Sequence, residues 1–531
     1  MKQLYFLFFA FSMGFAQVPK VWWVDVTNGN DNNNGQSEAT AFKSIQTLFT
    51  NNYLSAYNDT IYVKEGTYDF KDAEVQSRIG FVIVGVSGAE KTIFDADSTN
   101  RHFYINIYSN DSGKGYKQKF EGISFINGYE PASGGSIIIG RYADASFDAC
   151  IFENNQAGYG SGAMSSQGKL EINGTTFKNN KAYGKQSTHG SAIYMQGAAV
   201  DITNSLFHDN ETRSSIGNTS QGFSSHSVIH YAGGPQIYSD ALSSWNGVKA
   251  LLVNNTIVNN VSRSDASNAY ITSGIYYCSH DNNYDNDPTV YAFNNIIYGN
   301  KRGDAIEEYQ LQLHCGSPIF YNDYNLIYNL DDLRNGGGSG EKYLSSDYSI
   351  DVDPGFKDDA NGDFSLANSS LAIGAGATIA SFDEDVSAPK TDMLGTARPN
   401  PSGSSPDLGH IENSLASSPY PKQVQNVTAR GGSGSVTLSW DAVGTASDSI
   451  TYKVYMDTKA LSINIDLHVA TTSGTNATIT GLDNSTRYYF RVTAINAGGY
   501  EGTGSKTVDI TPCLLYTSPS PRDQRGSRMP S

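Results

Sequence analysis

The chain is poor in cysteine, in charge and in long apolar runs, and each shortage excludes a class of protein. Four cysteines in 531 residues are too few for a disulfide-stapled secreted scaffold. Charged residues make up only 17% of the chain, and the formal net charge is −17. Because phosphate backbones are bound by clusters of Lys and Arg, which this sequence lacks, nucleic acid is not an expected partner.

The one marked apolar run stands at the N-terminus, in MKQLYFLFFAFSMGFAQ. The run is preceded by Lys2 and ends in small residues. It is too short to span a bilayer, which requires about 20 apolar residues. It therefore predicts a secretory signal peptide, residues 1–16, cut between Ala16 and Gln17. No other segment is apolar enough to cross a membrane. We expect an exported, monomeric protein that is secreted or held at the cell surface.

The four cysteines do not have the spacing of a zinc site. Cys150 stands in the first half of the chain, and Cys278 and Cys315 in its middle. A disulfide between Cys278 and Cys315 and a pair of buried thiols are equally compatible with the sequence, and both remain open.

The last residues, CLLYTSPSPRDQRGSRMPS, depart abruptly from the preceding composition. Read back into codons, Cys513 to Asp523 matches a transposase-type sequencing adapter. We therefore expect residues 513–531 to be an artefact of sequencing and the native chain to continue differently after Pro512.

A short phrase recurs along the chain, as in ASFDACIFENN, LEINGTTFKNN and VDITNSLFHDN. Each copy joins an alternating strand pattern to an aromatic or aliphatic residue, a polar residue and an Asn. Most copies follow one another after 25 to 30 residues; one step of 50 residues is interpreted as two units with an insertion. The central residues are Phe125, Phe152, Phe177, Phe207, Ile257, Ile297 and Ile327.

A period of this length is typical of a solenoid, in which each unit buries its apolar face only against its neighbours. Helix-length amphipathic segments between the strands are missing, which disfavours a leucine-rich horseshoe. The pattern therefore predicts a parallel β-helix with an interior of stacked Phe, Ile, Leu and Val. The recurrent Asn is expected at a bend, with its side chain hydrogen-bonded in ladders from coil to coil.

Two segments carry a resemblance to known β-helix proteins. VDVTNGNDNNNGQSEATAFKSIQTLF, followed by NDTIYVKEGTYDF, resembles the start of secreted right-handed parallel β-helix proteins of the pectin-lyase-like superfamily. This implies a capping helix around Phe42 to Phe49, with coils beginning at Thr60–Val63 and Gly66–Tyr68. DMLGTARPNPSGSSPDLGHIE is similar to the end of bacterial surface β-helix domains. The matching residues are Asp392, Gly395, Arg398, Asp407, Gly409 and Glu412.

The region after the solenoid resembles a fibronectin type III domain. SVTLSW places Trp440 on an early core strand, and GLDNSTRYYFRVTAINAGG alternates as a later strand, with Tyr488 near the tyrosine-corner position. We thus predict an all-β chain: a right-handed parallel β-helix at 17–413, a linker at 414–422 and a fibronectin type III β-sandwich at 423–512.

No catalytic motif is recognisable. In pectin-lyase-like enzymes, lyases use a basic residue with Ca²⁺ and hydrolases use paired Asp residues, and the polygalacturonase-type motifs are absent. Arg101, His102 and Arg141 are isolated basic residues on strand edges, which are interpreted as structural or surface residues, with a role in a lyase as the alternative. The histidines of the repeat region have no Ser or Cys partner at a readable spacing and are interpreted as structural: His189, His226, His230 and His280.

Three Asp-rich loops are candidate Ca²⁺ sites, at Asp25–Asp31, Asp281–Asp287 and Asp351–Asp363. They are rich in oxygen ligands but lack the EF-hand spacing, and Asp and Asn are ordinary turn residues. Solvated turns are therefore expected, with structural Ca²⁺ as the alternative; no other cofactor is indicated. The later coils also carry tyrosines that either stack on sugars or pack against the protein: Tyr276, Tyr277, Tyr321, Tyr324 and Tyr328.

The function favoured by these features is adhesion or glycan binding by a secreted or cell-surface protein, with a polysaccharide or cell-surface glycan as its partner. The alternative is a Ca²⁺-dependent polysaccharide lyase, or a glycoside hydrolase, acting on acidic polysaccharide. A spacer without a ligand is a third possibility. The sequence is compatible both with an enzyme and with a protein that only binds its ligand.

Overall fold

A computed structural model describes residues 18–512, except for short internal stretches. The stretches that it leaves out are 56–57, 109–110, 112–114, 159, 185–188, 197–198, 215–224, 234–248, 265–269, 272, 280–288, 304, 307–309, 315–318, 329–333, 336–341, 346–348, 384, 445–448, 460–467 and 503. The chain divides into two compact units. The first comprises 1–351, 377–398 and 408–412, and the second comprises 352–376, 399–407 and 413–531.

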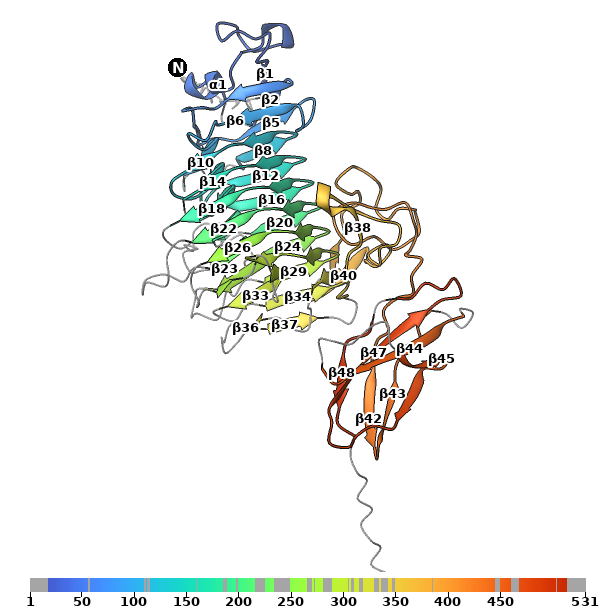
Figure 1. The fold of residues 1–531 in the computed structure, drawn as a ribbon. Helices are drawn as coiled ribbons and strands as arrows, with labels where there is room; N and C mark the ends of the chain where they lie inside the picture. Colours follow the sequence, from blue (N-terminus) through green and yellow to red (C-terminus); the bar gives the residue numbers. More distant parts are fainter. Residues whose placement is uncertain are drawn as a thin grey trace, which may run out of the picture. The chain divides into compact units, whose positions relative to one another are not determined.

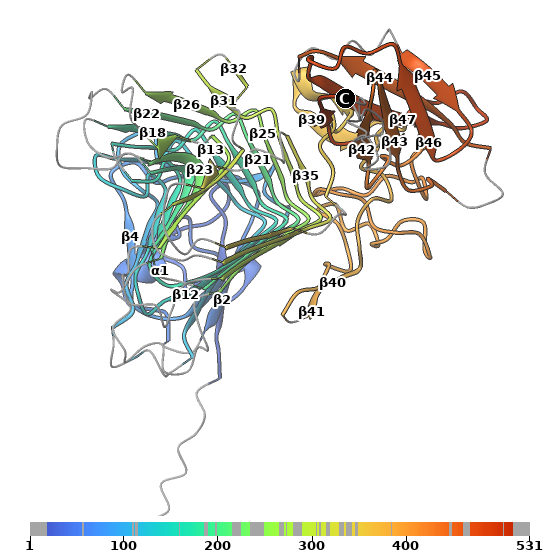
Figure 2. The ribbon, with the colours of Figure 1, turned by 90° about the horizontal axis from the view of Figure 1, so that it is seen from below.

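The first unit is a parallel β-solenoid, as predicted (Figure 1). Its coils add strands in turn to four sheets, which we number 1 to 4 in the order in which a coil visits them (Figure 2). Sheet 1 consists of β1 (Val21–Val24), β2 (Asp59–Val63), β5 (Phe81–Gly85), β8 (Lys117–Glu121), β12 (Asp144–Asp148), β16 (Lys169–Asn173), β20 (Val200–Thr203), β24 (Lys249–Val253), β29 (Thr289–Phe293), β34 (Ile319–Asp323) and β37 (Lys342–Ser345).

Sheets 2 and 3 follow along each coil. Sheet 2 consists of β3 (Gly66–Asp69), β6 (Thr92–Asp95), β9 (Ser124–Ile126), β13 (Ile151–Glu153), β17 (Thr176–Lys178), β21 (Leu206–His208), β25 (Thr256–Val258), β30 (Ile296–Tyr298) and β35 (Leu326–Ile327). Sheet 3 consists of β10 (Tyr129–Glu130), β14 (Gln156–Ala157), β18 (Lys181–Gly184), β22 (Glu211–Ser214), β26 (Val261–Ser264), β31 (Lys301–Arg302) and the antiparallel β32 (Ala305–Ile306).

Sheet 4 closes each coil. It consists of β4 (Val75–Ser77), β7 (Phe103–Ile105), β11 (Ile137–Ile139), β15 (Met164–Ser166), β19 (Gly190–Gln196), β23 (Ser225–Gly233), β28 (Ile275–Ser279), β33 (Leu311–His314) and β36 (Arg334–Asn335), and β27 (Tyr270–Ile271) pairs with β23.

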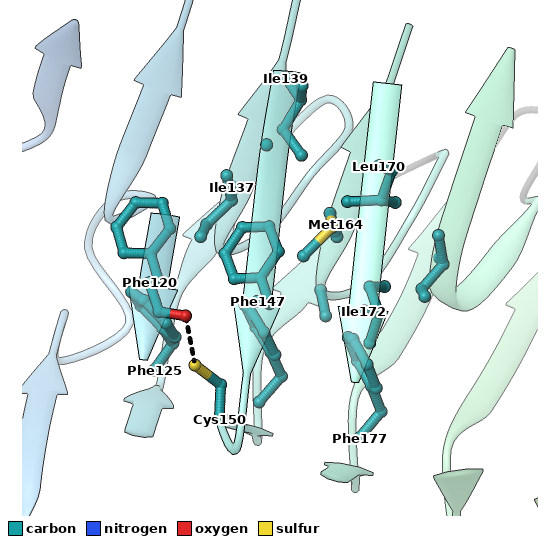
Figure 3. Packing of buried hydrophobic residues seen from close by; sticks show 14 of the residues in the cluster. Phe120, Phe125, Ile137, Ile139, Phe147, Cys150, Met164, Leu170, Ile172 and Phe177 are labelled. Atoms are coloured by element: carbon teal, nitrogen blue, oxygen red, sulfur yellow. Dashed lines mark hydrogen bonds between the residues drawn. The ribbon is translucent and has the colours of Figure 1, made fainter. Parts of the chain in front are cut away.

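The recurrent aromatic residues form a stack inside the solenoid. Phe125, Phe152, Phe177 and Phe207 are buried, and their successive ring centroids lie 4.9, 4.8 and 4.7 Å apart. This spacing equals the separation of neighbouring strands, because coil-to-coil register places each ring on the next. Figure 3 shows part of this core, where the thiol of Cys150 points to the carbonyl oxygen of Phe120, 3.6 Å away.

The step of 50 residues corrects one expectation. Ile257 pairs directly with Phe207 between β21 and β25, so the intervening chain forms a single enlarged coil and not two units. The sequence pattern misled because length alone does not separate a second coil from a long excursion within one coil.

The recurrent Asn residues form the predicted ladder at the bend after sheet 2. Asn154, Asn179 and Asn259 adopt positive φ, which makes the bend, and the next residue in each coil points inward. The Oδ1 of Asn180 accepts two hydrogen bonds from Asn155, one from its backbone N–H at 3.1 Å and one from its side-chain Nδ2 at 2.9 Å. The same pair of bonds is repeated by Asn210, Asn260 and Asn300.

A second ladder runs along the bend between sheets 1 and 2. Asn255 and Asn295 are joined by two bonds, at 2.9 Å from the backbone N–H and 3.0 Å from Nδ2. Asn295 is joined in the same way to Asn325. The ladder amides themselves are buried, and they satisfy backbone groups that would otherwise be costly to remove from water.

The N-terminal cap differs in detail from the expectation. The helix α1 covers Gln46–Thr50, preceded by the 3-10 turn η1 at Glu38–Thr40, so helix begins later than Phe42. The reason is that Phe42 serves the outer edge of β1: its N–H donates to the carbonyl of Trp23 at 2.9 Å, and its carbonyl accepts from Asp25 at 2.8 Å. A helical Phe42 would leave this edge unpaired.

A closing segment of the first unit returns along the side of the solenoid. It includes the hairpin of β40 (Ile379–Ser381) and β41 (Asp385–Ser387). Asn294 donates to the carbonyl of Ala377 at 2.8 Å, and Phe382 packs against Tyr291 with ring centroids 5.4 Å apart. Segments far apart in sequence thus share one small apolar cluster on the outer face of sheet 1.

The second unit contains the predicted β-sandwich. Its sheets are β42 (Thr428–Gly432), β43 (Ser435–Ser439) and β46 (Asn476–Thr480), and β45 (His468–Thr472), β44 (Thr451–Asp457), β47 (Tyr488–Ile495) and β48 (Val508–Ile510). Trp440 is buried between them, and the hydroxyl of Tyr488 accepts the N–H of Asp483 at 3.0 Å. The unit also holds β38 (Phe356–Asp358), η3 (Asp359–Asn361) and β39 (Asp363–Leu366).

Within the part of the chain that the structure describes, no helix is both long and apolar enough to cross a membrane.

Candidate functional site

A groove of about 570 Å³ lies on the outer face of sheet 4. Four tyrosines contribute to its lining, together with polar side chains and one arginine. Its lining residues are Tyr104, Asn106, Ile107, Tyr108, Ser133, Ile138, Ile139, Gly140, Arg141, Tyr142, Ser165, Gln167 and Tyr194. The groove therefore combines large flat apolar surfaces with hydrogen-bonding groups, as small-molecule and glycan sites commonly do.

The floor of the groove follows from strand register. Tyr104 on β7, Ile138 on β11, Ser165 on β15 and Tyr194 on β19 are successive partners across the parallel sheet. Their neighbours in sequence point into the core, so these four side chains face outward. With strands about 4.8 Å apart, the two tyrosines bracket a floor that spans four coils.

Tyr194 lies in a stack of rings at one end of this floor. Its ring centroid is 4.6 Å from that of His189, nearly parallel at 14°, and 5.2 Å from that of His230. Burial raises the pKa of the Tyr194 hydroxyl, so this group is neutral at physiological pH and available as a hydrogen-bond donor. The ring packing holds Tyr194 in one orientation.

Arginines flank the opposite end of the groove. The guanidinium of Arg78 lies over the ring of Tyr108 at 4.6 Å, and that of Arg101 lies 5.8 Å from the ring centroid of Tyr104. Arg101 is also bound by Glu74 and by Glu130, which makes it a fixed structural cation. Arg141, singled out from the sequence, lies in the groove wall.

His102 does not belong to the groove. It is buried in the core, where Nε2 donates to the carbonyl of Phe94 at 2.9 Å and Nδ1 accepts from the hydroxyl of Ser136 at 3.0 Å. Burial lowers its pKa to about 4. A neutral imidazole whose two ring nitrogens are both hydrogen-bonded supports the interpretation of His102 as structural.

The Asp-rich loops that are described use their carboxylates locally. Asp25 accepts two backbone N–H groups, from Thr27 and Asn28, both at 2.9 Å, and lies 3.7 Å from the Nζ of Lys64. Asp31 accepts the N–H groups of Lys43 and Ser44, both at 2.9 Å. Over the described ranges, no group of three or more His, Cys, Asp or Glu side chains is placed to hold a metal ion.

Several sequence candidates fall outside the described residues, and their predictions stay untested. They are the cleavage site Ala16–Gln17, the loop Asp281–Asp287, His280, Cys315, the tail 513–531, and the side chains of His226, Tyr277 and Cys278.

The tyrosines singled out from the sequence are not among the residues that line the groove. Tyr276 is buried and stacks on His230 at 4.8 Å, and Tyr321 stacks on Tyr291 at 5.1 Å. The sequence reasoning missed Tyr104, Tyr108, Tyr142 and Tyr194, although strand alternation around Tyr104 and Tyr194 would have marked both as outward-facing.

The comparisons with known proteins bear on the second unit. Residues 422–511 match the Fibronectin type III domain family. No curated protein sequence matches the chain.

Among solved structures, the fibronectin type-III domain of the human protein "fibronectin type III domain containing protein 3" is 25% identical in sequence. The match covers 19% of this chain and 95% of that chain, with a TM-score of 0.17. Chicken CNTN1 FN1-FN3 domains are 22% identical, covering 17% of this chain and 32% of that chain, with a TM-score of 0.15. The beta-1,2-glucanase from Parabacteroides distasonis is 19% identical, covering 20% of this chain and 15% of that chain, with a TM-score of 0.14. The chain thus spans about a third of the length of the CNTN1 FN1-FN3 structure.

Proposed function

We propose that this protein binds a glycan in the groove of sheet 4 and acts in adhesion or glycan attachment outside the cell. The observation that carries the proposal is the pair Tyr104 and Tyr194, which lie in register on one outward column and bracket a floor of Ile138 and Ser165. Aromatic rings offer apolar faces to sugar rings, while their hydroxyls and nearby side chains bond the sugar hydroxyls.

The architecture supports the same reading. A parallel β-helix joined to a fibronectin type III domain is typical of extracellular carbohydrate-active or adhesion proteins. A stiff parallel sheet also presents its outward residues at fixed spacing, which favours recognition of an extended polymer.

The enzymatic alternative lacks support at this groove. Its lining residues include no Asp, Glu or His, so the paired carboxylates that glycoside hydrolysis requires and the carboxylate ligands that a Ca²⁺-dependent lyase uses are missing from the lining. We therefore favour binding without turnover.

The test is retention of the purified protein on a panel of neutral and acidic polysaccharides, with Ca²⁺ or with chelator. For a polymer that is retained, Y104A/Y194A is expected to weaken binding at least about tenfold, or about 1.4 kcal/mol. Tyr62→Ala on sheet 1 is the matched control and should leave affinity unchanged.

Two outcomes would count against this function. Equal loss with Tyr62→Ala would remove the groove as the site. New chain ends or unsaturated uronate formed only with Ca²⁺ would replace binding by lyase activity.

We also propose that the chain is exported through its N-terminal segment. The support is the signal-peptide pattern of residues 1–16. N-terminal sequencing of the exported protein should begin at Gln17, and retention of residues 1–16 on a membrane-bound product would contradict the proposal.

A further inference from the structure

A second row of residues runs beside the floor of the sheet 4 groove and carries two side-chain amides. Asn106, Gly140 and Gln167 each stand two places after a floor residue, so they lie on the same outward face, and all three line the groove. The backbone continues the parallel register to them. The N–H of Gly140 donates to the carbonyl of Ile105 at 2.7 Å, and that of Gln167 donates to the carbonyl of Ile139 at 2.8 Å.

Gly140 leaves a slot in this row, between the two amides. A Cβ at Gly140 would lie 2.9 Å from the Oδ1 of Asn106 and 3.0 Å from the carbonyl oxygen of Ile105, so the Asn106 amide reaches along the row toward the missing side chain. Asn106 and Gln167 stand two strand spacings apart, about 9.6 Å, with only Gly140 between them. A small ligand group therefore has room between two amides.

Both amides keep hydrogen-bonding capacity for a ligand. Gln167 donates one Nε2 hydrogen to the Oε1 of Gln196 at 3.1 Å, which orients its amide and leaves the second Nε2 hydrogen for another acceptor. The side chain of Asn106 is half-buried and has no hydrogen-bond partner among the described residues. A partly desolvated amide without a partner costs free energy, which the hydrogen bonds of a ligand would recover.

We propose that the groove recognises an N-acetylated amino sugar, whose acetamido group enters this slot; the inference rests on the proposed glycan-binding function. The acetamido N–H donates to the Oδ1 of Asn106, and the acetamido carbonyl accepts from the Nε2 of Gln167. The methyl group lies over Gly140 and against Ile138. Side-chain amides suit this group because each offers both a donor and an acceptor. Of the lining residues, Arg141 alone carries a formal charge, which favours an uncharged ligand group.

Sheet topology favours a sugar over a peptide as the carrier of the acetamide. Extended peptides bind to sheets by pairing with an exposed strand edge, but β7, β11, β15 and β19 are interior strands of sheet 4, with a neighbour on each side. Tyr104 and Tyr194 instead present rings three strand spacings apart, about 14 Å, and the coil of Gly140 lies between them. Such aromatic faces stack on sugar rings.

The experiment measures the affinity of the purified protein for β-1,4-linked hexamers of N-acetylglucosamine, glucosamine and glucose, which share one backbone and differ at the 2-position. We expect the N-acetylglucosamine hexamer to bind at least about tenfold more tightly than the other two, because two hydrogen bonds are gained. N106A/Q167A should reduce this preference to less than about twofold. Gln156→Ala, which removes an outward amide on sheet 3, is the matched control and should keep the preference.

Gly140→Ala is a second test of the slot. The backbone of Gly140 lies outside the left-handed region, and the added methyl group meets the Oδ1 of Asn106, so the alanine is tolerated only if the Asn106 amide moves. We expect the preference for the N-acetylated hexamer to fall as it does in N106A/Q167A. Thermal unfolding of each variant checks that it is folded.

Four results would overturn the inference, and only the last also removes the proposed function. Equal binding of the three hexamers, lost in Y104A/Y194A, would leave a glycan site without acetamido recognition. Acetyl-trialanine amide bound as tightly as the N-acetylated hexamer would replace the sugar by a peptide. A loss of preference in Gln156→Ala as large as in N106A/Q167A would show that the slot is not its cause. Absence of binding to every hexamer and every polysaccharide of the panel would remove the glycan site itself.

Discussion

Arg398 and Glu412 form an ion pair at 2.9 Å with both side chains fully buried. Arg398 also donates to the Oδ1 of Asn204 and to the carbonyl of Gly409, both at 3.3 Å, while Asp392 accepts the N–H of Glu412 at 3.0 Å. The sequence motif that resembled the end of bacterial surface β-helix domains therefore fastens the closing segment to the side of the solenoid.

Breaking this pair should loosen the closing segment. Glu412→Gln leaves the guanidinium buried without its counter-charge, which costs about 3–5 kcal/mol for a buried pair. We expect faster hydrogen exchange of the amides in residues 377–398, with the strands of sheet 4 unchanged. Exchange as slow as in the unchanged protein would show that the hydrogen bonds of the segment suffice without the pair.

The Asn ladder predicts unequal effects at adjacent positions. Asn260→Ala removes the acceptor of the Asn210 backbone N–H and leaves a buried donor unsatisfied, at a cost of about 1–3 kcal/mol. Asn259→Gly keeps the positive φ of 55° that the bend requires and should change stability by less than about 1 kcal/mol. Denaturant unfolding of both variants tests this, and equal destabilisation would contradict the ladder's role.

His102 should make the solenoid sensitive to mild acid. Its pKa is lowered to about 4 in the folded protein by burial, against about 6.5 in the unfolded chain. The unfolded state therefore binds a proton first, so stability is complete above pH 6.5 and falls as the pH drops toward 4. The total change is roughly 3 kcal/mol.

Denaturant midpoints between pH 7.5 and 5 measure this effect. His102→Gln should be less stable at neutral pH, because the site is buried, but should lose less further stability between pH 6.5 and 5. An identical pH dependence in the two proteins would show that other groups cause the acid sensitivity.

Cys150 should be inert in the folded protein. The thiol is buried, and burial raises its pKa to about 12, so almost no reactive thiolate forms at pH 8. We expect iodoacetamide to leave Cys150 unmodified until denaturant is added, as read by peptide mass spectrometry. Rapid native labelling would mean that coils near β13 open readily.

The groove shows why the site was harder to predict than the fold. Arg141 stands out in the sequence only as an isolated basic residue, and Tyr104 and Tyr194, which line the same groove, lie far from it in sequence. They meet because insertions of different length between coils still bring β7, β11, β15 and β19 into register. Such insertions hide the register from a linear pattern, as the misjudged step between Phe207 and Ile257 also shows.

The sequence by itself determined the solenoid, since the alternating apolar residues, the positive-φ bend residue and the inward Asn that recur in most coils act on the neighbouring coil and require no distant partner. It also determined the β-sandwich, through the alternation around Phe490 and Val492. Only the tertiary structure decided which outward residues gather into the groove. It alone also decided that Arg398 reaches Asn204 across the chain, because such contacts depend on register and on the return of the closing segment, which local patterns do not encode.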